Sequence, residues 1–297
     1  MSTRLMHAVL AGLAALVSLL GWRRAGRLGG WLGLAWFHGL RIRRGVVFRN
    51  LALALPERAA EHRRIAREAY RQLGVTALEL MAMRSLGPQE LAARVRPRGL
   101  GYFEEAAARG RGVIVVTAHF GNFDLLACSQ AARGVSLAIV SRELGRGGGN
   151  RFWMETRTAS GLRILPRRGS GRGLLRWLRQ GRVLGLVVDQ RTGPRDGGLL
   201  TPFLGVPAWT TTAPAALALA TGAAIVPVRL ERGPDGDHEL IVEPEIPLQP
   251  GDRDQAIART TGAINDAVGA WVAARPEHWM WLHRRFEGAA DKDEIER

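Results

Sequence analysis

A histidine and an aspartate five positions apart stand in the stretch VIVVTAHFGNFDLL (113–126). The β-branched run Val113–Val116 predicts a buried strand, and apolar residues after Asp124 predict a helix. Five positions advance a helix by about 500°, so His119 and Asp124 can meet only in a corner between strand and helix. There Asp124 would orient one imidazole nitrogen while the other takes a proton from a hydroxyl. This pattern predicts general-base chemistry of the acyl-transfer type, without a protein nucleophile.

Two neighbouring features favour this interpretation over a histidine that merely caps a helix. Gly121 lets a ligand approach the backbone, and free N–H groups at the helix start could hold an oxyanion. A second apolar run, Val183–Val188, ends in Asp189 and Gln190, and strand ends are where sites gather in α/β folds. Asp189 would orient an arginine or a substrate hydroxyl, or cap nearby backbone N–H groups, and Gln190 can donate and accept.

Six sequence blocks occur in order between residues 43 and 286. They are HFGNFD (119–124), VSRELG (140–145), ILPRRG (164–169), LVVDQRTGPRDG (186–197), TPFLGVPAWTTTAPAALALATGAAIVPV (201–228) and PEHWMWLHRRF (276–286). Together they resemble the bacterial lipid A late acyltransferases (lauroyl and myristoyl transferases) of the lysophospholipid acyltransferase superfamily. The chain differs from them at Asp124, where those enzymes usually carry glutamate.

The resemblance implies a reaction and its partners. The donor would be a fatty acyl-acyl-carrier protein, the acceptor a lipid A precursor or related glycolipid, and no cofactor or metal would be needed. It assigns substrate contacts to Gly121 and Asn122, and it assigns phosphate or carboxylate binding to Arg142 and Arg167 within the arginine-rich stretch 141–172. Two alternatives stay open: another acceptor (lysophosphatidate, an aminolipid or a phosphatidylinositol mannoside), or a catalytically silent lipid-binding protein.

The net charge of the chain indicates which classes of partner it could bind. The 297 residues carry a formal net charge of +15, and Lys292 is the single lysine, so arginine dominates. A guanidinium-rich surface suits anionic membrane lipids, an acidic protein or nucleic acid. Nucleic acid ranks last because the basic residues are spread along the chain without a nucleic-acid-binding motif. The lone Cys128 excludes an intramolecular disulfide and is expected to pack in the core.

The N-terminal segment predicts a membrane anchor. Leu5–Trp22 spans 18 uncharged residues, about 27 Å of helix against a bilayer core of about 30 Å. Basic residues follow it directly, which opposes export. Leu28–Leu40, with Trp31, Trp36 and Phe37, predicts an interfacial helix. Together these segments indicate a protein held at the cell inner membrane with its catalytic domain on the cytoplasmic side.

The rest of the chain predicts one α/β domain. Val46–Arg98 reads as helical, with a break at Gly87-Pro88. Beyond Gly99, helical patterns alternate with short apolar strands, which predicts a mainly parallel central sheet flanked by helices. The expected strands are 113–116, 136–140, 183–188 and 224–229, and 239–242 adds a late strand that is antiparallel or at an edge. The expected division is an anchor and interfacial segment (1–44), an acyltransferase domain (45–287) and a polar tail (288–297).

Overall fold

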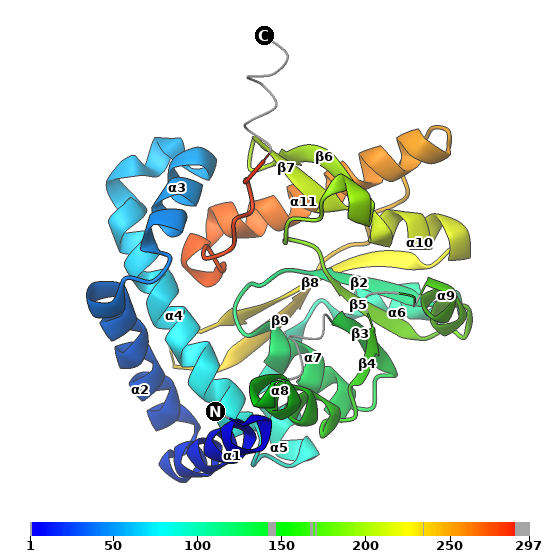
Figure 1. Cartoon of the computed structure of the whole chain (residues 1–297). Helices are drawn as coiled ribbons and strands as arrows, with labels where there is room; N and C mark the ends of the chain where they lie inside the picture. The colour runs from blue at the N-terminus through cyan, green and yellow to red at the C-terminus, as the bar shows by residue number, and fades with distance from the viewer. Residues whose placement is uncertain (1, 142–146, 167–168, 170, 234, 289–297) are drawn as a thin grey trace.

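A seven-stranded, mostly parallel sheet forms the centre of the protein (Figure 1). The computed structural model describes residues 2–141, 147–166, 169, 171–233 and 235–288. The strand order is β1-β9-β8-β2-β5-β3-β4. The strands are β1 (Val95–Arg98), β2 (Val113–Thr117), β3 (Leu137–Ser141), β4 (Arg163–Pro166), β5 (Val183–Val187), β8 (Ala224–Arg232) and β9 (His238–Val242). The predicted α/β architecture is therefore confirmed.

Strand β2 lies in the middle of the sheet and is buried along its whole length. Its residues alternate between the two hydrophobic cores, Ile114 and Val116 entering one and Val113 and Val115 the other, because successive side chains of a strand point to opposite faces. β5 and β8 both run parallel to β2. The carboxyl ends of these three strands therefore lie at the same edge of the sheet.

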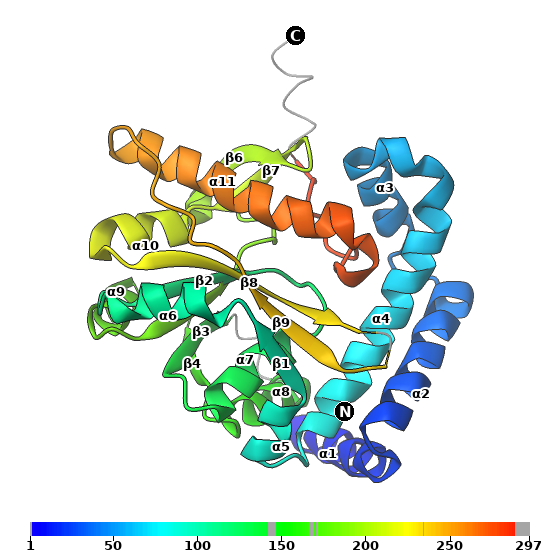
Figure 2. The same cartoon turned by 180° about the vertical axis from the view of Figure 1, so that it is seen from behind.

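Helices cover both faces of the sheet (Figures 1 and 2). Those of the α/β part are α6 (Leu100–Ala108), α7 (Phe123–Ala132), α8 (Gly148–Thr158), α9 (Gly171–Arg179), α10 (Ala213–Thr221) and α11 (Arg253–Ala274). The N-terminal part comprises α1 (Thr3–Leu20), α2 (Trp22–Ala35), the π-helix η1 (Trp36–Leu40), α3 (Arg44–Ala54), the 3₁₀ helix η2 (Pro56–Glu61), α4 (His62–Met83) and α5 (Pro88–Ala93). Two further 3₁₀ turns are η3 (Pro194–Asp196) and η4 (Pro276–His278).

The structure differs from the sequence prediction at both ends of the sheet, because neither β1 nor the opposite edge strand β4 was predicted. β9 is antiparallel to β8, as expected, but it is not an edge strand because β1 pairs with it in parallel. The sequence predicted helix through Val95–Arg98. Pro97 explains the difference, since proline disrupts a helix interior but is tolerated in an edge strand. A separate antiparallel hairpin, β6 (Gly198–Phe203) with β7 (Val206–Thr211), completes the strands of the described part.

The N-terminal helices pack on the body of the protein. α1 contacts α4 and α8, and α2 runs along α4. The contact between α2 and α4 is made by glycines: a Cβ at Gly33 would overlap the backbone of Tyr70, and one at Gly74 would overlap the backbone of Gly29. The glycines thus let the two helix backbones approach closely.

The predicted anchor is one helix, with a corrected boundary. α1 ends at Leu20, and Gly21 adopts a positive φ of 72° before Trp22 begins α2. By length and composition α1 could cross a membrane, and its outward stripe of Leu5, Val9, Leu13, Leu16 and Leu20 is exposed.

The predicted interfacial segment divides into exposed and buried parts. Trp31 of α2 is 73 % exposed, whereas Phe37 is 1 % exposed, and its ring packs against Tyr70. The prediction that Phe37 faces lipid is wrong: it belongs to the core.

Candidate functional site

His119 is paired with Asp189, at the carboxyl ends of β2 and β5. Its Nδ1 lies 2.8 Å from Oδ1 of Asp189, and its backbone N–H donates to Oδ2 at 3.0 Å. The register explains this meeting: Thr117 is opposite Val187, so His119 and Asp189 are each two residues farther along. The carboxylate also accepts from Nε1 of Trp279 at 2.7 Å. Three hydrogen bonds therefore fix Asp189 against the imidazole.

The electrostatics keep Asp189 ionised. The residue is only 2 % exposed, and burial alone would raise its pKa. The charge of His119 and the hydrogen bonds from His119 and Trp279 outweigh this and lower the pKa of Asp189 to about 2. A buried carboxylate held in this state fixes the proton on Nδ1 and leaves Nε2 as the basic nitrogen.

The predicted pair of His119 and Asp124 is not formed, which corrects the sequence prediction. α7 begins at Phe123, so Asp124 already belongs to the helix. Its Oδ1 accepts from Nε of Arg157 of α8 at 2.6 Å, and both side chains are buried. Arg157 also donates to Ser141 at 3.2 Å and lies over the ring of Trp153. Asp124 therefore joins α7 to α8.

An Asp124→Asn variant is expected to lose stability. Removing one partner of a buried ion pair leaves the charge of Arg157 uncompensated, which costs about 3–5 kcal/mol. The free energy of unfolding from urea denaturation measures this loss. Replacing both partners, Asp124→Asn with Arg157→Gln, should recover part of it. A fully stable but inactive Asp124→Asn enzyme would contradict this structural role.

The exposed side of His119 is bounded by three side chains. Nε2 of Gln190 lies 3.0 Å from Nε2 of His119 and 3.1 Å from Nε2 of His283. The ring of His283 lies 5.1 Å from that of His119, and burial lowers the pKa of His283 to about 4. Phe123 contacts His119 from the other side, at 4.7 Å between ring centres. Gln190 thus occupies the place from which a hydroxyl would reach Nε2.

The segment after α11 closes the site from behind. Met280 donates its N–H to the carbonyl of His119 at 3.0 Å, and Trp279 packs against Trp281 and Phe203. Arg285 is fully buried, and its guanidinium donates to Thr210 and the carbonyl of Trp209 on β7. The role of Trp279 beside Asp189 was not predicted from the sequence. The sequence block PEHWMWLHRRF (276–286), which contains Trp279, is the feature that could have indicated this role.

Gly121 and Asn122 make the contacts that hold the turn from His119 to Phe123. The N–H of Gly121 donates to the carbonyl of His278 at 2.9 Å, so it is occupied and cannot serve as an oxyanion donor as it stands. A Cβ at Gly121, whose φ is +58°, would overlap the carbonyl of Leu230. Asn122 is fully buried and caps α7 by accepting from the N–H of Leu125. Asn122 was predicted to contact substrate; in the structure its side chain contacts Leu125 and Glu79 of the protein itself.

A buried charge network supports Asn122. Glu79 of α4 accepts from Nδ2 of Asn122 at 2.9 Å and from Arg232 at 2.6 Å, and Nε2 of His238 lies 3.4 Å away. Burial would raise the pKa of Glu79, but Arg232 and His238 lower it to about 2. This network fixes the turn to α4 and β8.

Stability is expected to fall steadily as the pH drops from about 6.5 to 2. Burial lowers the pKa of His278 to about 3 and that of His283 to about 4, so the unfolded chain takes up these protons first. Glu79 and Asp189 act in the same direction below about pH 4.5, because their native pKa values of about 2 lie below the unfolded ones. Urea midpoints across this range provide the measurement. Unchanged or rising stability between pH 6.5 and 3 would refute the expectation.

The remaining predicted residues divide into two groups. Arg142 and Arg167 lie outside the described residues. Cys128 is fully buried, and burial raises the pKa of its thiol to about 12, as expected for core packing. In the part of the chain that the structure describes, no group of three or more His, Cys, Asp or Glu side chains is arranged to hold a metal ion.

Comparison with known proteins identifies similar sequences. A family model described as bacterial lipid A biosynthesis acyltransferase matches residues 2–287. The lipid A biosynthesis lauroyltransferase of Escherichia coli K12 is 30 % identical over 88 % of this chain and 84 % of its own length. The lipid A biosynthesis palmitoleoyltransferase of the same organism is 29 % identical over 84 % and 80 %. A phosphatidylinositol mannoside acyltransferase of Mycobacterium tuberculosis CDC 1551 is 28 % identical over 63 % and 58 %.

Proposed function

Because the chain belongs to the bacterial lipid A biosynthesis acyltransferase family and is an acyltransferase, we propose that it moves a fatty acyl chain from an acyl-carrier-protein thioester to a hydroxyl of a lipid A precursor or related glycolipid. The pairing of His119 with Asp189 at the strand ends is the observation that carries the proposal. It supplies a general base whose second nitrogen is held by a carboxylate.

In the proposed mechanism the acceptor hydroxyl displaces the amide of Gln190 and donates its hydrogen bond to Nε2 of His119. Nε2 takes the proton as the hydroxyl oxygen attacks the thioester carbonyl carbon. The carbon–sulfur bond then breaks, and the leaving thiolate recovers the proton from the imidazolium. Asp189 stabilises the imidazolium between these two transfers. The products are the ester and the free thiol, and no covalent enzyme intermediate forms.

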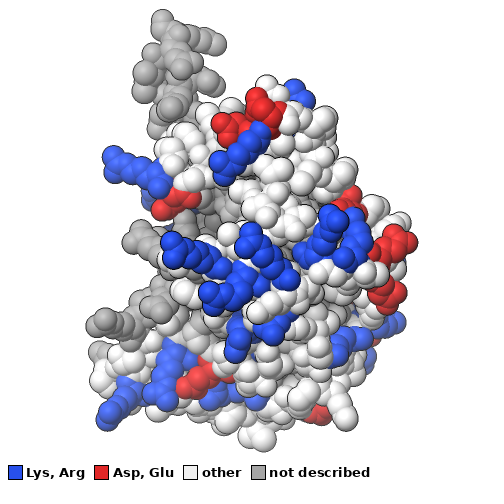
Figure 3. All heavy atoms as spheres, turned by 90° about the vertical axis from the view of Figure 1, so that its right-hand side faces the viewer, with Lys and Arg blue, Asp and Glu red and all other residues white. Residues whose placement is uncertain are grey.

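The arginine-rich surface supports the proposal that the acyl donor is an acidic carrier protein. Exposed Arg172, Arg176 and Arg179 lie on α9, and arginine side chains gather on the face of the molecule that carries this helix (Figure 3). Complementary charge speeds the encounter with an acidic partner and selects against basic ones. We propose this face as the side from which an acyl-carrier protein approaches.

The N-terminal helices support a location at the inner membrane, with the catalytic domain on the cytoplasmic side. Besides the exposed apolar stripe of α1, α2 exposes Leu28, Trp31 and Leu32. An apolar face with an exposed tryptophan and flanking arginines suits insertion at a lipid surface.

A second acceptor class is favoured by one of the relatives. The mycobacterial protein is named for phosphatidylinositol mannoside, so a mannosylated lipid is the alternative acceptor for this chain. Both versions share the same base and the same donor chemistry.

The experiment that tests the proposal is transfer from a labelled acyl-carrier protein to a panel of acceptors. The panel holds lipid A precursor, phosphatidylinositol mannoside, lysophosphatidate and an aminolipid, with products identified by mass spectrometry. We expect product on the lipid A precursor. Product on the mannoside alone would favour the second acceptor class. An enzyme that binds vesicles and acylates nothing on the panel would contradict the proposed reaction.

A further inference from the structure

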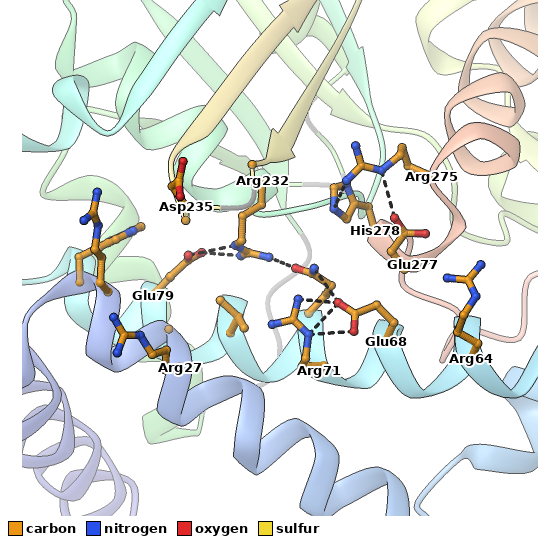
Figure 4. A pocket seen from close by; sticks show the side chains of 17 residues that line it. Arg27, Arg64, Glu68, Arg71, Glu79, Arg232, Asp235, Arg275, Glu277 and His278 are labelled. Carbon is orange, nitrogen blue, oxygen red and sulfur yellow. Dashed lines mark hydrogen bonds and ion pairs between the residues drawn. The ribbon is translucent and has the colours of Figure 1, made fainter.

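A polar pocket of about 630 Å³ lies between α2, α4, the β8–β9 hairpin and η4 (Figure 4). It is distinct from the exposed side of His119. Six arginines line it, against four acidic residues: Arg23, Arg27, Arg64, Arg71, Arg232 and Arg275, with Glu68, Glu79, Asp235 and Glu277. The volume is within the range of small-ligand sites and exceeds what a single inorganic ion needs.

Most charges in this pocket are already paired within the protein. Arg71 binds Glu68, Arg232 binds Glu79, and Arg275 binds Glu277, so three of the four acids are neutralised. Arg64 is paired with Glu61, which lies outside the pocket lining. Asp235, the fourth acid, offsets one further arginine, so the lining together with Glu61 keeps an excess of one positive charge.

Arg23 and Arg27 are the source of that excess. They stand four residues apart on α2, so they lie on neighbouring turns of one helix face. Among the described residues neither has an ion pair or side-chain hydrogen bond, and Figure 4 shows Arg27 at the pocket without a partner. Two unpaired guanidiniums over a cavity lined by further arginines are suited to an oxyanion, because guanidinium matches phosphate with two parallel hydrogen bonds.

We propose that this pocket binds a phosphate-bearing polar group of about the size of glycerol phosphate. The charge favours a phosphate ester, and the volume admits the attached polyol. Two sources share this chemistry: a soluble phosphate ester and the headgroup of an anionic phospholipid. Arg23 and Arg27 at the pocket are exposed to solvent, and α2 also exposes Trp31 and Leu32, which could contact a lipid surface.

The pocket also adjoins the turn from His119 to Phe123, through two of its lining residues. Glu79 contributes to its lining and at the same time binds Asn122 of that turn. His278, another lining residue, accepts the N–H of Gly121 through its carbonyl. The binding proposal does not rest on the proposed reaction, and its test below requires no turnover.

The test compares two double variants of equal charge change in the full chain. Arg23→Gln with Arg27→Gln removes the unpaired pocket cations. Arg63→Gln with Arg67→Gln removes two exposed arginines of α4, also four residues apart, that do not line the pocket. Calorimetry in neutral detergent with sn-glycerol 3-phosphate measures the soluble arm. Flotation with vesicles containing phosphatidylglycerol measures the lipid arm, both at constant ionic strength.

We expect the pocket variant to weaken binding by about tenfold or more, and the control by less than about twofold. Selective loss of glycerol phosphate binding supports the proposal with a soluble ligand. Selective loss of vesicle binding supports it with a lipid headgroup. Equal effects of the two variants in both arms, or no binding by the unmodified protein in either arm, would overturn it. Equal melting temperatures of the three proteins check that each is folded.

Discussion

An Asp189→Asn enzyme is expected to transfer acyl groups roughly 10²–10⁴-fold more slowly than the unmodified protein. Asparagine at 189 is similar in size but carries no charge to stabilise the imidazolium of His119. Its amide can also donate to Nδ1, which would place the proton on Nε2 and remove the base. The acceptor's KM should change much less than kcat, because Asp189 is buried behind His119 and does not reach the substrate.

The informative comparison is with Asp124→Asn, measured in the same assay. The structure pairs Asp189 with His119 and Asp124 with Arg157, so the first change should reduce kcat and the second chiefly the free energy of unfolding. Rates must be normalised to folded protein, which near-ultraviolet circular dichroism measures. The reverse result, with Asp189→Asn active and a folded Asp124→Asn enzyme inactive, would return the pairing role to Asp124.

A His119→Ala enzyme is expected to lose at least as much activity, about 10²–10⁴-fold, because it lacks the base altogether. In the described part of the chain the neighbouring His283 does not replace it, because its ring centre is 5.1 Å from that of His119 and it has no hydrogen bond to Asp189. The loss should persist from pH 6 to 9, since alanine has no proton to exchange.

The assay for this variant is single-turnover transfer from labelled acyl-carrier protein, with His283→Gln as a matched control. The control removes a second imidazole at the same site, and it should retain most of the rate because the pair of His119 and Asp189 stays intact. Full activity in His119→Ala, or an equal loss in the control, would be incompatible with the proposed mechanism.

Predictions from the sequence were accurate where the interactions are local. The apolar run after Gly112 forms β2, which ends at Thr117. The predicted helix, α7, begins at Phe123 after the turn. These elements depend on burial and on residues close in the chain. The helix forecast for Val95–Arg98 was wrong because a pairing partner 143 residues away, His238 opposite Val95, made it a strand.

The candidate site also depends on contacts between residues far apart in the sequence. The sequence identified His119, and it placed Asp189 and Gln190 at a strand end, but it paired His119 with the nearer carboxylate. Asp189 lies 70 positions away, and only the parallel register of β2 with β5 brings it to the imidazole. Asp124 is close in sequence, but helix geometry and Arg157 hold its carboxylate elsewhere.

The sequence by itself determined the strand–turn–helix around His119, the apolar helix at the N-terminus, the α/β class and the resemblance to an acyltransferase family. The tertiary structure alone decided which carboxylate serves His119, and which arginines gather in the pocket beside α2. The physical reason is the distance along the chain over which each interaction acts. Helix periodicity and turn chemistry act over a few residues and can be read from their order. A buried hydrogen bond or a shared pocket depends on strand register and helix packing between segments far apart in the chain.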